Sequence, residues 1–152
     1  MSKTILITGG AGFIAHHVVD KILSTTDWKI VTLDRLDFSG NLNRLNEVVT
    51  AYPKSERQRV RVIHHDLKAE LNPEIAATIG RVDYISHLAA GSHVDRSITY
   101  PLEFVMDNVV GTAHILVLMK YLDQPLRESI IKKMIGIIQP IPIQLLKLAQ
   151  KN

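Results

Sequence analysis

A glycine-rich turn near the start of the chain stands between a strand-like and a helix-like segment. Thr4–Thr8 is a short run of apolar and β-branched residues, which is typical of a buried strand. Gly9–Gly10–Ala11–Gly12 follows it, and from residue 12 to 24 the apolar residues recur at helical spacing. A buried strand that passes through glycines into a helix is the first unit of a parallel α/β sheet.

The same alternation continues along the chain and predicts the fold class. Further strands are expected at 29–33, 59–64 and 82–88, and further helices at 41–50, 72–79 and 101–122. The pattern predicts an α/β fold: a truncated, three-layer, Rossmann-like parallel sheet of strand order 3-2-1-4. Residues 53–57 are expected to form an exposed connection. One face of the last helix is expected to carry Phe104, Val105, Val109, Ile115, Leu116 and Leu118.

The residues of the turn fit the binding of a dinucleotide. Gly9 permits a tight turn, and Gly12 lets the backbone approach a pyrophosphate at the helix N-terminus. Ala15 is small enough for close packing of the helix on the strand. Asp34, at the end of the second strand, is placed to accept hydrogen bonds from the adenosine ribose, which favours NAD over NADP. Arg35 leaves the alternative open, because an arginine here can bind a 2′-phosphate.

Composition excludes several other classes of protein. With 152 residues, 46% hydrophobic and 22% charged, the chain has the size of one domain and enough apolar residues for a core. It has no cysteine, which excludes disulfides, thiolate metal sites and a cysteine nucleophile. Its formal charge of +3 does not indicate a nucleic-acid partner, and no histidine pair has metal-ligand spacing. Without a visible signal peptide or membrane span, a cytoplasmic location is expected.

Two segments resemble a known family. Residues 8–14 resemble the opening of the extended short-chain dehydrogenases, which include the sugar-nucleotide epimerases and dehydratases. Residues 87–98, with Pro101, Phe104 and 108–112, are similar to the dTDP-glucose 4,6-dehydratases in particular. The stretch from Asp34 to Asp37 and residues 40–42 support the same subfamily. The resemblance covers about residues 3 to 123.

The resemblance implies a set of NAD contacts. Those at the pyrophosphate and adenosine are Gly9, Gly12, Phe13, Ile14, Asp34, Arg35, Leu36, Asp37, Asp66 and Leu67. Those on the far side of the cofactor are Leu88, Ala89, Ala90 and Ser92, of which Ser92 would also lie near the substrate sugar. The sequence departs from the family at Gly91, where an acidic residue is common, and at Asp107, where a threonine is common. His16–His17 replaces a small residue followed by histidine.

The residues that the family's chemistry requires are missing. Tyr52, Tyr84, Tyr100 and Tyr121 have no lysine four positions later, so no Tyr-x-x-x-Lys pair and no catalytic residue is assigned. The expected function is that of a truncated NAD-binding portion of a dTDP-sugar dehydratase, unable to catalyse the reaction alone. Two alternatives stay open. One is a non-catalytic interaction or oligomerisation module that binds itself or a full-length relative, and the other is half of a split enzyme.

Residues 124–152 form an atypical tail after the NAD-binding domain of residues 1–123, expected to be irregular or helical. Codons permitted for residues 137–152 can be chosen so that another reading frame encodes Y-N-S-T-N-P-Y-S-A-S-K-A-G-A-E-E. This peptide resembles the family's Tyr-x-x-x-Lys segment. We therefore expect the tail to be frame-shifted coding sequence. The alternative is a tail selected as it stands, for instance to cover a sheet edge.

Overall fold

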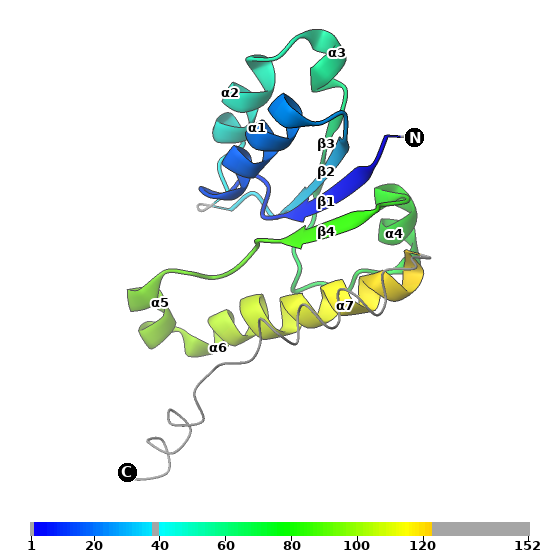
Figure 1. Cartoon of the computed structure of the whole chain (residues 1–152). Coiled ribbons are helices and arrows are strands. Elements are labelled where there is room, and N and C mark those ends of the chain that lie inside the picture. The colour runs from blue at the N-terminus through cyan, green and yellow to red at the C-terminus, as the bar shows by residue number, and fades with distance from the viewer. Residues whose placement is uncertain (1, 38–39, 123–152) are drawn as a thin grey trace, which may run out of the picture.

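A computed structural model describes residues 2–37 and 40–122 of the chain, and its centre is a parallel sheet (Figure 1). The four strands are β1 (Thr4–Thr8), β2 (Lys29–Asp34), β3 (Val60–His64) and β4 (Tyr84–His87). They lie in the order β3-β2-β1-β4, and all neighbouring pairs are parallel. The predicted strand order is confirmed.

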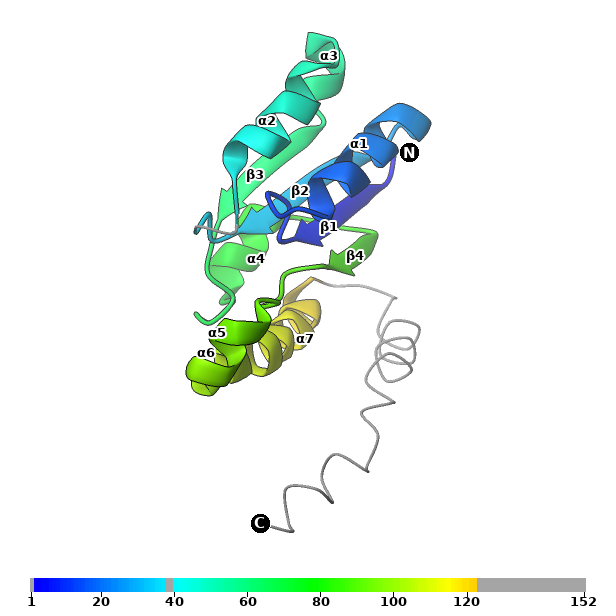
Figure 2. The same cartoon turned by 90° about the vertical axis from the view of Figure 1, so that its left-hand side faces the viewer.

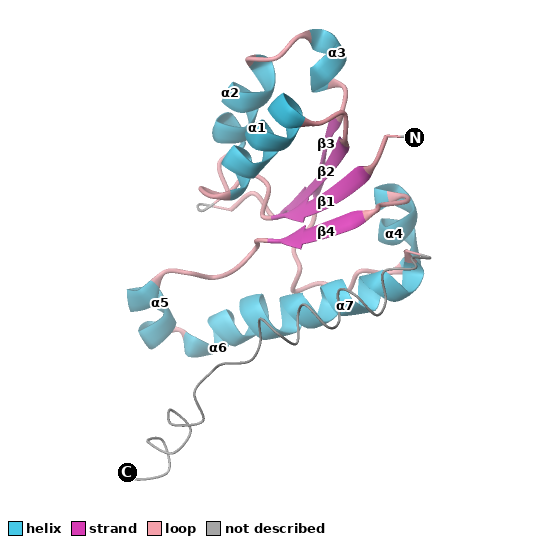
Figure 3. Ribbon diagram, viewed as in Figure 1, coloured by secondary structure: helices cyan, strands magenta, loops and turns pink. Residues whose placement is uncertain are grey.

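Helices cover both faces of the sheet, which makes the predicted three layers (Figure 3). On one face lie α1 (Ala15–Thr25) and α2 (Leu42–Thr50), followed by the short α3 (Lys54–Arg57). On the other face lie α4 (Pro73–Ile79) and a long helix. The long helix consists of α6 (Pro101–Val105), a π-helical turn η1 (Met106–Val110) and α7 (Gly111–Tyr121), and it is preceded by α5 (Val94–Thr99).

The alternation of side chains along the strands divides the core in two. Ile5 and Ile7 of β1 pack with Val19 and Leu45 from α1 and α2. Leu6 points the other way and packs in a second cluster that contains side chains of α4 and α7. Such burial of both faces explains why the strands are rich in isoleucine, valine and leucine.

Local signals at the helix ends explain several element boundaries. The side chain of Asn41 accepts a hydrogen bond from the Asn43 amide at the start of α2. The Asn72 side chain likewise accepts from the Ile75 amide, with Pro73 in the first turn of α4. Gly80 ends α4 with a positive φ of 76°, as a C-terminal glycine commonly does.

Two short helices and one helix face differ from the sequence-based expectation. Residues 54–57 form α3 instead of a loop, and α5 is not predicted. The apolar residues of the long helix do not share one face, because Ile115 and Leu118 are buried while Val105 and Val109 are exposed. The spacing itself is the reason. In a regular helix, Val105 and Val109 lie roughly 100–140° around the axis from Phe104. Ile115 and Leu118 lie within roughly 40° of Phe104, so they face another way.

The long helix also bears on the expectation that no segment spans a membrane. Pro101–Tyr121 has 21 residues and a mean hydropathy of 1.5 in its most apolar stretch, so its length and composition alone would allow it to cross a bilayer. Core helices of soluble proteins meet the same criterion, and here Ile115 and Leu118 pack on the sheet. The predicted tail of residues 124–152 lies outside the described residues.

Candidate cofactor site

A cleft of about 760 Å³ lies at the carboxyl ends of the strands, the edge that faces the viewer in Figure 2. Ligands of open α/β sheets bind at this edge. The cleft is lined by most of the predicted cofactor residues: Gly9, Gly12, Asp34, Arg35, Asp37, Asp66, Leu67, Leu88, Ala89, Ala90 and Ser92. Phe13, Ile14 and Leu36 are not among its lining residues, and the side chains of Phe13 and Ile14 are exposed.

The glycine turn is held by its own backbone. Gly9 has a φ of +72°, and its amide donates to the Leu33 carbonyl at 2.8 Å. The Gly12 amide donates to the Gly9 carbonyl, also at 2.8 Å. A Cβ on Gly9 would come within 2.9 Å of the Ala89 backbone, so the turn and the end of β4 can approach this closely only because residue 9 is glycine. Ala15 is 2% exposed, which fits the close packing expected of it.

Asp34 joins the glycine turn to the end of β2. Its side chain is buried, and one carboxylate oxygen accepts from the Ala11 amide at 2.9 Å. The other oxygen accepts from the Leu36 amide at 2.8 Å, and Leu36 has a positive φ of 54°. A carboxylate oxygen has more than one acceptor position, so these bonds orient Asp34 without using up its capacity to accept from a ribose.

A hydrogen-bond network fixes the opposite wall of the cleft. The Thr8 hydroxyl accepts from the Leu88 and Ala89 amides at 3.1 and 3.2 Å, and it lies 2.6 Å from Nδ1 of His87. Nε2 of His87 lies 3.0 Å from the Thr112 hydroxyl, which donates to the carbonyl of Asn108. The Thr8 hydroxyl accepts from two amides, so its own proton is available to donate to Nδ1 of His87. The Thr112 hydroxyl uses its proton toward Asn108 and therefore accepts from Nε2. The network thus favours a neutral imidazole with its proton on Nε2.

The end of this network reaches the cleft-lining Gly91. The side chain of Asn108 accepts from the Gly91 amide at 2.7 Å and donates to its carbonyl at 3.0 Å. Asn108 lies in η1, and π-helical turns frequently occur at functional sites. The wall of the cleft after β4 is therefore fixed to the long helix.

Stability should depend on pH through His87. Burial lowers the pKa of His87 below the ordinary value of 6.5, so the unfolded chain takes up this proton first as the pH falls. The contribution of His87 is therefore complete above about pH 6.5 and is lost as the pH falls below it. Urea unfolding at pH 5 and pH 7 should show a smaller difference for His87→Gln than for the wild type. His17→Gln is the control, because His17 is exposed, and it should show the same difference between pH 5 and pH 7 as the wild type. If His87→Gln also shows the wild-type difference, His87 does not contribute to the pH dependence of stability.

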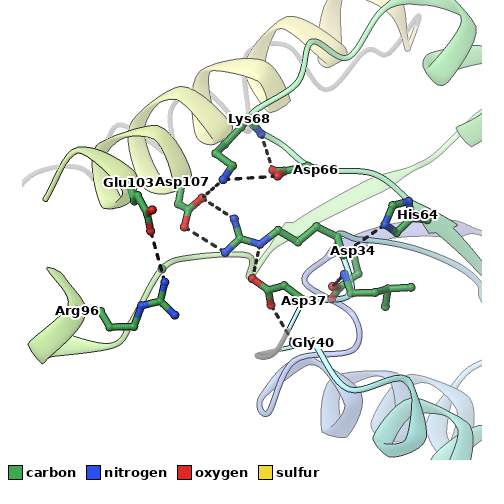
Figure 4. Close-up of polar contacts among 12 residues, drawn as sticks. Asp34, Asp37, Gly40, His64, Asp66, Lys68, Arg96, Glu103 and Asp107 are labelled. Carbon is green, nitrogen blue, oxygen red and sulfur yellow. Dashed lines mark hydrogen bonds and ion pairs between the residues drawn. The ribbon is translucent and has the colours of Figure 1, made fainter. Parts of the chain in front are cut away.

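The end of the cleft that follows β2 and β3 is held by ion pairs (Figure 4). The Arg35 guanidinium contacts Asp37 through Nε at 2.6 Å and Asp107 through both terminal nitrogens at 2.6 and 3.2 Å. Lys68 lies 3.7 Å from Asp66 and 3.8 Å from Asp107. Burial lowers the pKa of Arg35, but the hydrogen bond and charge of Asp107 and the charges of Asp37 and Asp66 outweigh it, so the pKa is raised.

Several residues of the cleft escaped the sequence-based prediction. These are His64, His65, Lys68, His93, Arg96 and Glu103. Lys68 stands two positions after Asp66 in a turn, and this adjacency is the one signal by which it could have been found. Within residues 2–37 and 40–122, no group of three or more metal-ligating side chains could hold a metal ion.

Comparison with known proteins places this fold and cleft in a family. Residues 6–133 match the GDP-mannose 4,6 dehydratase family, a match over most of the chain. The chain belongs to this family. Among curated family members, the dTDP-glucose 4,6-dehydratase of Escherichia coli is 40% identical over 108 residues, which are 71% of this chain and 28% of that protein. The Salmonella typhimurium enzyme is 42% identical over 112 residues, 74% of this chain and 29% of that protein.

Solved structures of the family agree with the fold. The dTDP-glucose 4,6-dehydratase DesIV from Streptomyces venezuelae, with NAD and TYD bound, has a TM-score of 0.63 and 37% identity, covering 76% of this chain and 35% of that one. The resemblance to dTDP-glucose 4,6-dehydratases is thus confirmed. The chain spans less than a third of the length of these curated family members.

Proposed function

We propose that this chain is the NAD-binding part of a dTDP-glucose 4,6-dehydratase-like enzyme and that it binds NAD without completing the dehydratase reaction. The observation that carries the proposal is the meeting of the glycine turn, Asp34 and Ala89 around one cleft. The partial positive charge at the N-terminus of α1 suits a pyrophosphate, and the Asp34 carboxylate suits ribose hydroxyls. A cytoplasmic location is part of the proposal.

The proposal gives each wall of the cleft a role toward the cofactor. Asp37 lies with Asp34 at the ribose, and Asp66 and Leu67 lie at the adenine. Leu88, Ala89 and Ala90 line the opposite side, where the Thr8–His87 network holds them. Ser92 lies toward the nicotinamide and a dTDP-sugar. When bound, NAD would supply the hydride acceptor, and this chain's residues would bind and orient it.

The sequence supports the proposed absence of turnover. A Tyr-x-x-x-Lys pair, which supplies a base and a lysine that lowers its pKa, does not occur in the 152 residues. If the tail is frame-shifted coding sequence, the gene carries that pair in another frame. Sequencing the gene through residues 124–152 decides this point: a second frame that does not encode N-P-Y-S-A-S-K contradicts it.

Calorimetric titration with NAD tests the proposed function. The wild type should bind NAD saturably, and NAD at 100 times its Kd should raise the free energy of unfolding by about 2.7 kcal/mol. Asp34→Asn should weaken binding about tenfold or more, since it removes the charge that faces the ribose. Asp83→Asn is a matched control, because Asp83 also accepts from a backbone amide, that of Thr4, outside the cleft. No binding at millimolar NAD, or formation of a dehydrated sugar from dTDP-glucose, would contradict the proposal.

A second candidate function is supported by an exposed apolar stripe. Ile98, Leu102, Val105 and Val109 are all exposed along α5 and the long helix. Exposed apolar patches of this kind mark interaction sites, and the candidate partner is a second copy of this chain. Sedimentation equilibrium should then show dimers, and strict monomers would exclude this candidate.

A further inference from the structure

The end of the cleft that is proposed to bind adenosine is crossed by an ion pair that joins two distant parts of the chain. Arg35 directly follows β2, and Asp107 belongs to η1 of the long helix. The two terminal nitrogens of the guanidinium each contact one oxygen of Asp107, which is the two-point geometry of a strong arginine–carboxylate pair. Figure 4 shows Asp107 on the long helix and Asp37 after β2, the two carboxylates that Arg35 contacts.

The position of Asp107 is built into the surrounding structure. The Asp107 side chain is only 13% exposed. The neighbouring Asn108 is bonded twice to Gly91, which fixes the π-helical turn against the loop after β4. A Cβ on Gly91 would lie 3.2 Å from a carboxylate oxygen of Asp107 and 3.1 Å from the Phe104 ring. The small residue at 91 therefore leaves room for the carboxylate beside the cleft.

The charges around Arg35 do not favour an added phosphate. Four carboxylates line this end of the cleft, those of Asp34, Asp37, Asp66 and Asp107, together with the two cations Arg35 and Lys68. Negative charges therefore outnumber positive ones. Both cations also lie within ion-pair distance of carboxylates. For Arg35 to bind a 2′-phosphate, it would have to give up these pairs and leave Asp107 beside a second anion, which repulsion disfavours.

We infer that Asp107, by holding Arg35, sets the cofactor specificity of this site: it makes the site reject a dinucleotide phosphorylated at the 2′ position and accept one with a free 2′-hydroxyl. The inference rests on the proposed NAD binding and names a residue that determines its selectivity. Asp107 acts through Arg35 and is not required to touch the cofactor.

The test compares the Kd of NAD and of NADP for the wild type and Asp107→Asn, by calorimetry on the full chain. The asparagine keeps the shape and removes the charge. We expect the NADP-to-NAD ratio of Kd values to fall about tenfold or more, mainly because NADP binds more tightly, with the Kd of NAD changing less than threefold. Asp83→Asn is the matched control, because it is the same substitution in a carboxylate that pairs with an arginine, Arg81, outside the cleft. The ratio should not change in this control.

A double-mutant cycle with Arg35→Ala shows whether Asp107 acts through Arg35. In the Arg35→Ala background, Asp107→Asn should no longer bring a tenfold gain for NADP. The inference is overturned if Asp107→Asn changes the ratio no more than Asp83→Asn does, or if the gain persists without Arg35. In those cases NAD binding itself is intact and the proposed function stands. If neither the wild type nor any variant binds NAD, the proposed function is wrong, and the inference that rests on it is wrong as well.

Discussion

Replacing Leu118 with alanine should lower the free energy of unfolding by about 2–5 kcal/mol, the usual range for a buried leucine. Leu118 is fully buried and packs with Leu6 of β1 and Ile79 of α4. The truncation leaves a cavity between the long helix and the sheet. Urea unfolding at neutral pH measures the loss.

Leu102→Ala is the matched control, since Leu102 lies on the same helix and is 73% exposed. Its effect should stay within about 0.5 kcal/mol, as for most surface substitutions. The same helix carries Asn108, which holds the cleft-lining Gly91 by two hydrogen bonds, so Leu118→Ala should also weaken NAD binding. Equal effects of the two variants on stability would show that α7 does not pack on the sheet as described.

Replacing Gly9 with alanine should destabilise the protein and disrupt the cofactor site together. A non-glycine residue at a positive φ costs about 1–3 kcal/mol. A Cβ at residue 9 would also come within 2.9 Å of the Ala89 backbone, where relief requires movement of the cleft wall. Such overpacking adds about 1–3 kcal/mol. Thermal and urea unfolding measure the sum.

Gly80→Ala separates the two contributions. Gly80 also has a positive φ, of 76°, but a Cβ there would meet nothing within 4 Å. This variant should show the backbone strain alone and keep its NAD affinity, while Gly9→Ala should lose at least tenfold in affinity. If the two variants lost the same stability and Gly9→Ala bound NAD normally, the close approach of the glycine turn to β4 would be refuted.

Much of the fold could be predicted because its signals are local. The apolar run before Gly9, the helical spacing after it and the caps Asn41 and Asn72 each act within a few residues. Strand order then followed from the way βαβ units connect. The apolar face of the long helix was mispredicted because the residues assigned to it do not follow one stripe of the 3.6-residue period.

The residues of the site likewise fall into those that have a local sequence signal and those that have none. The glycine turn and Asp34 could be found because they stand at fixed spacing around one strand–helix unit. The pair between Arg35 and Asp107 could not, since the two residues are 72 positions apart and meet only when the long helix docks. The network from Thr8 through His87 to Thr112 joins three elements and has no local signal either.

The most direct test of the central claim is an NMR titration of the ¹⁵N-labelled full chain with NAD. The claim is that the cleft at the carboxyl ends of the strands binds this cofactor. It predicts saturable shifts of the amides of Gly9, Gly12, Leu36 and Ala89, all with one Kd. Absence of saturable shifts at millimolar NAD, or saturable shifts confined to the opposite edge of the sheet near Asp27 and Asp83, would contradict it.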